Sequence, residues 1–281
     1  MRVGREPIGK TGRVPWVGGD QEHAARPVTP VNDALFLAGA GVVAGMVGTA
    51  GGITSLVSYP ALLWAGVAPL QANVANIVAL VACWPGSAVA SRPELRGRGP
   101  WLRRWGIVAA VGGTAGSVLL LVTPAGVFGR VVPFLVVAGS VALLLQPRIA
   151  ARPTGQAGAG WGSALLLPCG LFALSVYNGY FGAGSGVLLL ALLLLTTEPN
   201  LVAANALKNM VVGAATITSA ILFAVVAHVD WAAVGPLAAG SLVGSLVGPW
   251  IARRIPPALL RWLVALTGLA LAVRLWLTPA G

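Results

Sequence analysis

Ionisable residues are scarce in this chain. Only 9% of its 281 residues are charged, and seven of them are Asp or Glu, whereas a soluble domain carries about 25% charged residues. Apolar runs of roughly 17 to 25 residues, the length that crosses a bilayer, recur between short loops. With a mean hydropathy of +0.86, the composition predicts an all-α, polytopic helical membrane protein, multi-pass in the cell (inner or plasma) membrane.

Sequence motifs typical of enzymes and metal sites are missing. The two cysteines, Cys83 and Cys169, each lie in an apolar run and indicate neither a disulfide nor a metal site. Ser185 lacks the flanking glycines of a hydrolase nucleophile elbow, since Ala183 and Val187 stand two positions away on either side. No zinc-binding or Walker sequence is found. We therefore expect no enzyme activity, no metal and no cofactor.

The net charge of +11 does not indicate a nucleic-acid partner, because the arginines gather in a few loops, as the positive-inside rule describes. The partners expected are the lipid bilayer and a small anionic substrate. The sequence does not fix the oligomeric state. We predict that both termini lie outside. In this orientation the loop around Arg92–Arg104 lies inside, and so do most of the other basic loops.

Glycines divide the chain into two related parts. The spacing of Gly45, Gly48 and Gly52 recurs unchanged at Gly179, Gly182 and Gly186. We predict a flexible polar N-terminal tail over residues 1–33, a first membrane repeat over 34–146, a linker over 147–160 and a second membrane repeat over 161–281. Each repeat has a Gly-broken helix hairpin plus three transmembrane helices, and this odd number of crossings makes the repeats inverted.

The two glycine breaks are candidate substrate-binding segments. At membrane depth, non-helical backbone persists only inside protein or beside a watery cavity. The candidate residues are Gly48, Thr49, Gly51 and Gly52 in the first break and Gly182, Gly184, Ser185 and Gly186 in the second. The alternative is close helix packing, which we prefer for Gly240, Gly244 and Gly248. Tyr177 and Asn178 precede the second break, where a packing role is favoured over lining the cavity.

An amide-rich turn follows each break. Asn73 and Asn76 form the first, and Asn205, Lys208 and Asn209 form the second. Amide and ammonium donors beside the N–H groups of a broken helix suit an oxyanion. The alternatives are that Lys208 snorkels to the lipid headgroups and that the asparagines are interhelical hydrogen-bond glue. Asp230, after His228, is expected to cap a helix.

Taken as a set, these segments resemble the TauE/SafE sulfite-exporter family, also called the toluene-sulfonate uptake permease family. The likeness covers about Ala34 to Trp276 and is carried by the duplicated breaks, Pro60, Gly66, "ANVAN" at 72–76, "ANALKN" at 204–209 and "VDW" at 229–231. The chain departs from the family pattern at Ala50, Ser185 and Leu194. The resemblance implies a permease for sulfite, organosulfonates or related sulfur-containing or organic anions.

These observations together predict a secondary transporter in which the two breaks meet near the membrane midplane around a small anion. Lys208 would supply the counter-charge and the asparagines would donate hydrogen bonds. The alternatives are an anion-selective channel, which would share the donor-rich pocket, and a membrane enzyme or scaffold that transports nothing, which the missing catalytic motifs disfavour.

Overall fold

The computed structural model describes residues 31–150, residues 161–252 and part of 262–277. Within these residues every regular element is a helix, so the all-α prediction is confirmed. Residues 31–150, here called the first half, contain α1 (Val31–Gly51), α2 (Ser55–Trp64), α3 (Pro69–Leu80), α4 (Cys83–Ala90), α5 (Arg92–Leu95), α6 (Gly99–Val122) and α7 (Ala125–Ala150). Residues 161–252, the second half, contain α8 (Trp161–Tyr180), α9 (Ser185–Thr196), α10 (Leu201–Val226) and α11 (Trp231–Ala252).

The helices are long and apolar enough for a multi-pass membrane protein. Among the described residues, five spans meet the length and composition of a membrane crossing: 31–49, 69–90, 99–122, 125–145 and 201–226. Shorter apolar helices cover 55–64, 165–180, 185–196 and 231–247. Exposed side chains on the outer faces include Val111, Phe134, Ile221 and Val225, which suits contact with lipid.

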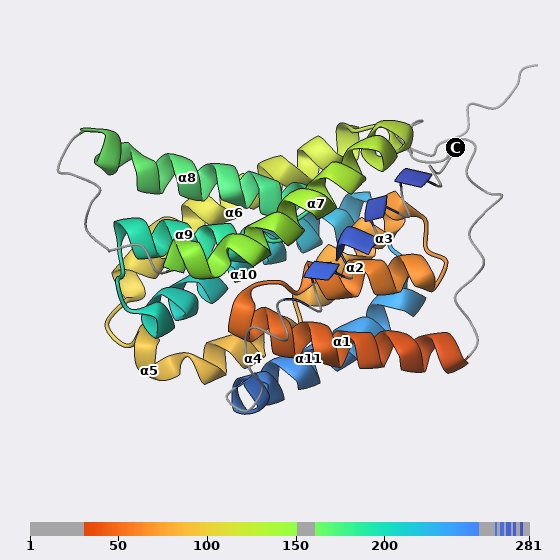
Figure 1. Cartoon of the computed structure of the whole chain (residues 1–281), viewed down its shortest axis with the longest axis horizontal. Helices are drawn as coiled ribbons and strands as arrows, with labels where there is room; N and C mark the ends of the chain where they lie inside the picture. The colour runs from red at the N-terminus through yellow and green to blue at the C-terminus, as the bar shows by residue number, and fades with distance from the viewer. Residues whose placement is uncertain are drawn as a thin grey trace, which may run out of the picture.

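The two halves share an order of elements. Each starts with a long helix, breaks at glycines and continues in a short helix: α1 and α2 in the first half, α8 and α9 in the second. The helix that follows is continuous in α10 but interrupted between α3 and α4, where the sequence predicts one helix over 74–91. In Figure 1, α1 and α8 begin at opposite ends of the molecule. The inverted membrane orientation of the halves stays a prediction.

Some predicted boundaries fall where the structure gives little or no description. Residues 1–30 of the predicted tail and 151–160 of the predicted linker lie outside the described residues, as do many positions of the predicted helix over 259–276. The helix α1 begins at Val31, before the predicted end of the tail, and α7 continues to Ala150, past the predicted start of the linker. The division into repeats stays a prediction.

Each broken helix packs against the other half. The helix α1 lies along α11, and α8 lies along α6. Glycines make both contacts close: a Cβ on Gly45 would lie 2.3 Å from the carbonyl oxygen of Ser241, and one on Gly116 would lie 1.9 Å from that of Val176. The packing role predicted for Gly240 and Gly244 is confirmed, because the backbone of α1 leaves no room for a Cβ at either position. Gly248 lies where side-chain surroundings are not described.

Candidate functional site

The two glycine breaks touch each other. Gly52, just after α1, has φ +73°, and a Cβ there would lie 2.9 Å from the backbone of Gly186, in the first turn of α9. In return, a Cβ on Gly186 would lie 2.6 Å from the carbonyl oxygen of Gly52. Only glycine at both positions allows this approach, because it has no Cβ and accepts positive φ. The contact sets the starts of α2 and α9 beside one cavity.

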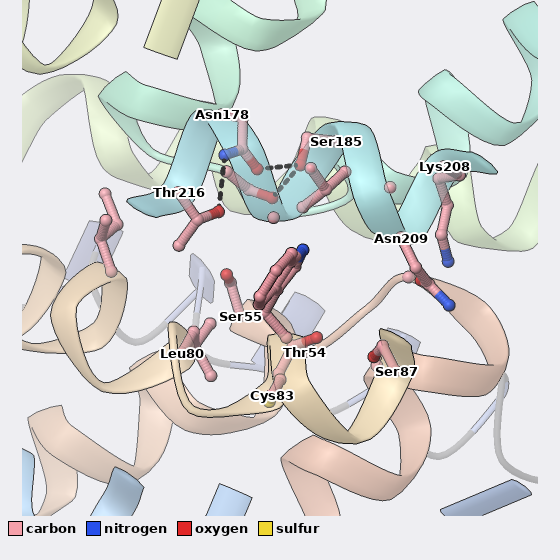
Figure 2. Close-up of a pocket in the computed structure, with 18 of the residues that line it drawn as sticks. Thr54, Ser55, Leu80, Cys83, Ser87, Asn178, Ser185, Lys208, Asn209 and Thr216 are labelled. Atoms are coloured by element: carbon pink, nitrogen blue, oxygen red, sulfur yellow. Dashed lines mark hydrogen bonds between the residues drawn. The ribbon is translucent and has the colours of Figure 1, made fainter. Parts of the chain in front are cut away.

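This cavity has a volume of about 80 Å³ and lies between the two halves (Figure 2). A single water needs roughly 10–15 Å³, so the cavity suits a group of a few non-hydrogen atoms. Its polar lining residues are Thr49, Thr54, Ser55, Cys83, Ser87, Asn178, Ser185, Lys208, Asn209 and Thr216. Its other lining residues are the glycines 48, 52, 182, 186 and 213 and the apolar residues Ile77, Leu80, Val81, Trp84, Phe181 and Val212.

Lys208 is the charged residue of the cavity wall. Its side chain is 1% exposed, so it lies inside the protein and not on the outer surface. Its Nζ donates a hydrogen bond of 2.8 Å to Oδ1 of Asn205 and lies 3.1 Å from the Cβ position of Gly52. Within residues 31–150 and 161–252, one ion pair is found, between Arg98 and Glu198. No carboxylate of these residues therefore pairs with Lys208.

The neighbouring asparagines tie Lys208 to the first break. Asn205 donates its Nδ2 to the carbonyl oxygen of Thr49 at 3.1 Å, and Asn209 donates to the same oxygen at 3.4 Å. That carbonyl lies in the last turn of α1, where helices carry unpaired acceptors and partial negative charge. Asn209 lines the cavity, whereas Asn205 positions the ammonium from behind.

A hydrogen-bonded group from three helices of the second half forms another part of the wall. Ser185 donates its Oγ to Oδ1 of Asn178 at 2.8 Å, and Asn178 donates its Nδ2 to Oγ1 of Thr216 at 3.1 Å (Figure 2). Ser185 also contacts the carbonyl oxygen of Gly182 at 2.8 Å. Asn178, for which the sequence favours packing, thus combines a packing role with a place on the cavity.

Not every sequence-predicted site residue lies on the cavity. Asn73 donates to the carbonyl oxygen of Tyr180 at 2.8 Å, and Asn76 accepts from the hydroxyl of Ser58. Both asparagines are fully buried, and neither is among the lining residues. Gly184, with φ +75°, is the N-cap residue of α9 and faces Gly139 of α7. Gly51 ends α1, and nothing further is described of its surroundings.

Several lining residues escape the sequence-based prediction. Cys83, Trp84 and Ser87 come from α4, and Thr216 comes from the middle of α10. Trp84 lies so close to α10 that a Cβ on Gly213 would meet its ring at 1.8 Å. The packing of a large side chain on one helix against a glycine on another leaves no pattern in the sequence of either helix. The predicted capping role of Asp230 is confirmed, since its Oδ1 accepts from the N–H groups of Ala232 and Ala233.

The chemistry of the lining favours an anion. The cavity offers the Lys208 ammonium, the Asn209 amide and the hydroxyls of Ser55 and Ser87. The N-terminal ends of α2 and α9 add partial positive charge, although N–H groups there, such as those of Val57 and Val187, already bond to Thr54 and Gly184. The described residues hold no group of three or more His, Cys, Asp or Glu side chains able to bind a metal ion.

Comparison with known proteins agrees with this architecture. The family model described as sulfite exporter TauE/SafE matches residues 34–275. A probable membrane transporter protein of Haemophilus influenzae is 25% identical over 241 residues, which cover 84% of this chain and 91% of that protein. No solved structure matches the chain significantly. Because the family model spans most of the chain, this protein belongs to the sulfite exporter TauE/SafE family of membrane transporters.

Proposed function

We propose that the protein is a secondary transporter of small anions, with sulfite, organosulfonates and related sulfur-containing or organic anions as the substrate class. The observation that carries the proposal is a buried lysine, without a carboxylate partner among the described residues, on a small cavity where two helix breaks meet. Burying an unpaired charge costs several kcal/mol. A bound anion offsets that cost.

The residues of the cavity have distinct roles in this proposal. Lys208 supplies the counter-charge, and Asn209 donates a hydrogen bond to the anion. Ser185 has one hydroxyl proton, which goes to Oδ1 of Asn178 in this structure, so it donates to the anion only after that hydrogen bond is released. Gly48, Gly52, Gly182 and Gly186 let the backbone of the two breaks approach the ligand. Asn205 orients the lysine through its 2.8 Å contact. Asn73 and Asn76 act behind the cavity, where they hold α3 against α2 and the end of α8.

Alternating access follows from where the halves meet. The cavity takes lining residues from α1, α2, α3, α4, α8, α9 and α10, and therefore from both halves. When the halves or their broken hairpins move relative to each other, the contact between Gly52 and Gly186 and the shape of the cavity change together. We propose that this movement exposes the anion to each side in turn, as in other transporters with broken helices, and leaves it chemically unchanged.

Flux through proteoliposomes tests the proposal. Labelled sulfite and labelled methanesulfonate are measured with the wild-type protein, Lys208→Gln and, as a matched control, Ser117→Ala, which alters a buried hydroxyl outside the cavity. Loss of the charge is expected to lower flux roughly a hundredfold, because breaking a buried charge contact costs about 2–5 kcal/mol. The control is expected to keep wild-type flux.

Unlabelled anion trapped inside the vesicles separates a carrier from a channel. A carrier shows saturable uptake that the trapped anion accelerates, whereas a channel shows no such exchange. Full flux in Lys208→Gln would remove Lys208 from the proposal. Absence of flux for every anion tested with wild-type protein would contradict the transport function.

A further inference from the structure

We propose that the cavity selects monovalent anions over divalent anions of the same size. This inference rests on the proposed function and narrows its substrate class by charge. The structure supports it in three ways: the number of charges on the cavity wall, the neutral residue at the matching position of the first half, and the apolar surface that forms part of the wall.

The cavity wall carries one charged side chain. Lys208 is the one lysine or arginine among the described lining residues, and none of those residues is acidic. Apart from Lys208, the titratable group on the wall is the thiol of Cys83, which contacts the carbonyl oxygen of Ser241 at 3.8 Å. A single ammonium therefore faces the ligand. One negative charge neutralises the Lys208 ammonium, whereas a second would find no second cation on the cavity wall.

The first half does not add a second cation. Asn73 and Asn205 each donate to a carbonyl at the end of the other half's broken helix. Three residues further along the chain stand Asn76 and Lys208, respectively. Asn76 is neutral and fully buried, and Oδ1 of this residue accepts from Ser58. The position that would carry a symmetric second charge therefore carries none.

The apolar wall limits how many charged oxygens can be solvated. Ile77, Leu80, Val81 and Val212 contribute side chains that donate no hydrogen bonds. Leu80 and Lys208 lie at opposite ends of the cavity (Figure 2). A ligand with its charged oxygens near Lys208 and a small apolar substituent near Leu80 fits both positions, and the hydroxyls of Thr216 and Ser55, also on the Leu80 side in Figure 2, carry no charge. Sulfate, with charge shared by all four oxygens, places charged oxygens against the apolar surface.

Methanesulfonate and sulfate form a matched pair of probes, because both are small and tetrahedral and they differ by one charge. Binding to the purified wild-type protein is measured by calorimetry and by the shift in thermal midpoint. We expect methanesulfonate to bind roughly tenfold or more tightly, since an uncompensated buried charge costs more than the 1.4 kcal/mol of a tenfold change. Monomethyl sulfate, which is also monovalent, is expected to follow methanesulfonate.

A charge-addition variant gives the reverse test. Asn209→Lys places a second ammonium on the same wall, beside Lys208, and is expected to shift the ratio of affinities toward sulfate by roughly tenfold. Equal or tighter sulfate binding in the wild-type protein would overturn the inference while leaving anion transport intact. An unchanged ratio in folded Asn209→Lys, as judged by its thermal transition, would overturn it as well. Absence of binding by any anion would instead contradict the proposed function.

Discussion

Asn73 in the first half and Asn205 in the second half make the same kind of contact. Each donates its side-chain amide to a carbonyl at the end of the broken helix of the opposite half, Tyr180 and Thr49 respectively. Their other amide atoms differ. Oδ1 of Asn205 accepts from Lys208, whereas Oδ1 of Asn73 is buried with no hydrogen-bond partner among the described residues.

This difference separates the contacts that hold the fold together from the charged residue on the cavity. The shared contact holds each amide turn to the opposite break, and so it belongs to the architecture of both halves. The charge is present in one half alone, at Lys208, and lies on the cavity. A nearly symmetric scaffold thus carries an asymmetric site, so equivalent substitutions in the two halves should have unequal effects.

The two glycines in contact should not be equally sensitive to alanine. At Gly52 alanine meets both a positive φ of +73° and the backbone of Gly186, and we expect the free energy of unfolding to fall by about 3 kcal/mol. Gly186→Ala meets crowding without positive φ, so about 2 kcal/mol is expected. Chemical or thermal unfolding in detergent measures both values.

Gly66 supplies the control for this comparison. It has φ +87° but nothing within 4 Å of its Cβ position, so Gly66→Ala reports backbone strain alone, about 1–2 kcal/mol. If Gly52→Ala costs no more than Gly66→Ala, the close contact between the two breaks is not present in solution.

Substitutions of Lys208 and Asn76 should change the free energy of unfolding in opposite directions. Lys208→Met removes a buried charge and is expected to raise the free energy of unfolding of the anion-free protein by about 1–3 kcal/mol, while it abolishes flux. Asn76→Ala removes the acceptor of the Ser58 hydroxyl and is expected to lower the stability by about 1–2 kcal/mol, with flux per folded molecule retained. Destabilisation by Lys208→Met would show that the ammonium has an anionic partner besides its hydrogen bond to Asn205.

The shared amide contacts can be compared directly. Asn73→Ala and Asn205→Ala each remove a hydrogen bond to a helix-end carbonyl, and each is expected to cost about 1 kcal/mol of stability. The two variants should differ in their affinity for the anion. Asn205→Ala also removes the acceptor of Lys208, so its apparent affinity for methanesulfonate should fall, whereas Asn73→Ala should bind the anion normally. An equal loss of affinity for methanesulfonate in both variants would show that the difference between the halves does not affect anion binding.

The smallest effect is expected at the ion pair between Arg98, which precedes α6, and Glu198, which follows α9. Arg98 is about one-third exposed, and partly exposed pairs contribute about 1 kcal/mol or less. Glu198→Gln should therefore lower the thermal midpoint slightly and leave anion affinity unchanged. Reduced affinity in this variant would extend the binding region beyond the cavity.

The sequence predicts the helices well because hydrophobicity and glycine are local signals. Helices predicted from the sequence to start at Val187 and Ala232 start at Ser185 (α9) and Trp231 (α11). The two breaks, whose glycine spacing repeats from Gly52 to Gly186, are in contact. The interruption between α3 and α4 also has a local signal, which the prediction of one helix over 74–91 passes over. Pro85 has no N–H for the carbonyl of Val81, and its ring crowds that carbonyl, so the helix breaks one turn before the proline.

The site was only partly predictable, because its lining comes from helices far apart in the sequence. Lys208 is conspicuous as the lysine of an apolar segment, and the neighbouring asparagines are visible beside it. Which asparagines line the cavity depends on how α3 and α10 are rotated, and that rotation places Asn209 on it and Asn73 behind it. Trp84 and Thr216 reach the cavity through long-range packing against other helices, which an isolated apolar run does not encode.

The most direct test of the central claim is the position of a bound anion. A crystal structure with bromomethanesulfonate, which has a single charge and an anomalous scatterer, locates the ligand without assumptions about its contacts. The account predicts the sulfonate within hydrogen-bonding distance of Nζ of Lys208, between the first turns of α2 and α9. Anomalous density confined to another part of the molecule, such as the basic segment around Arg96 and Arg103, would contradict it.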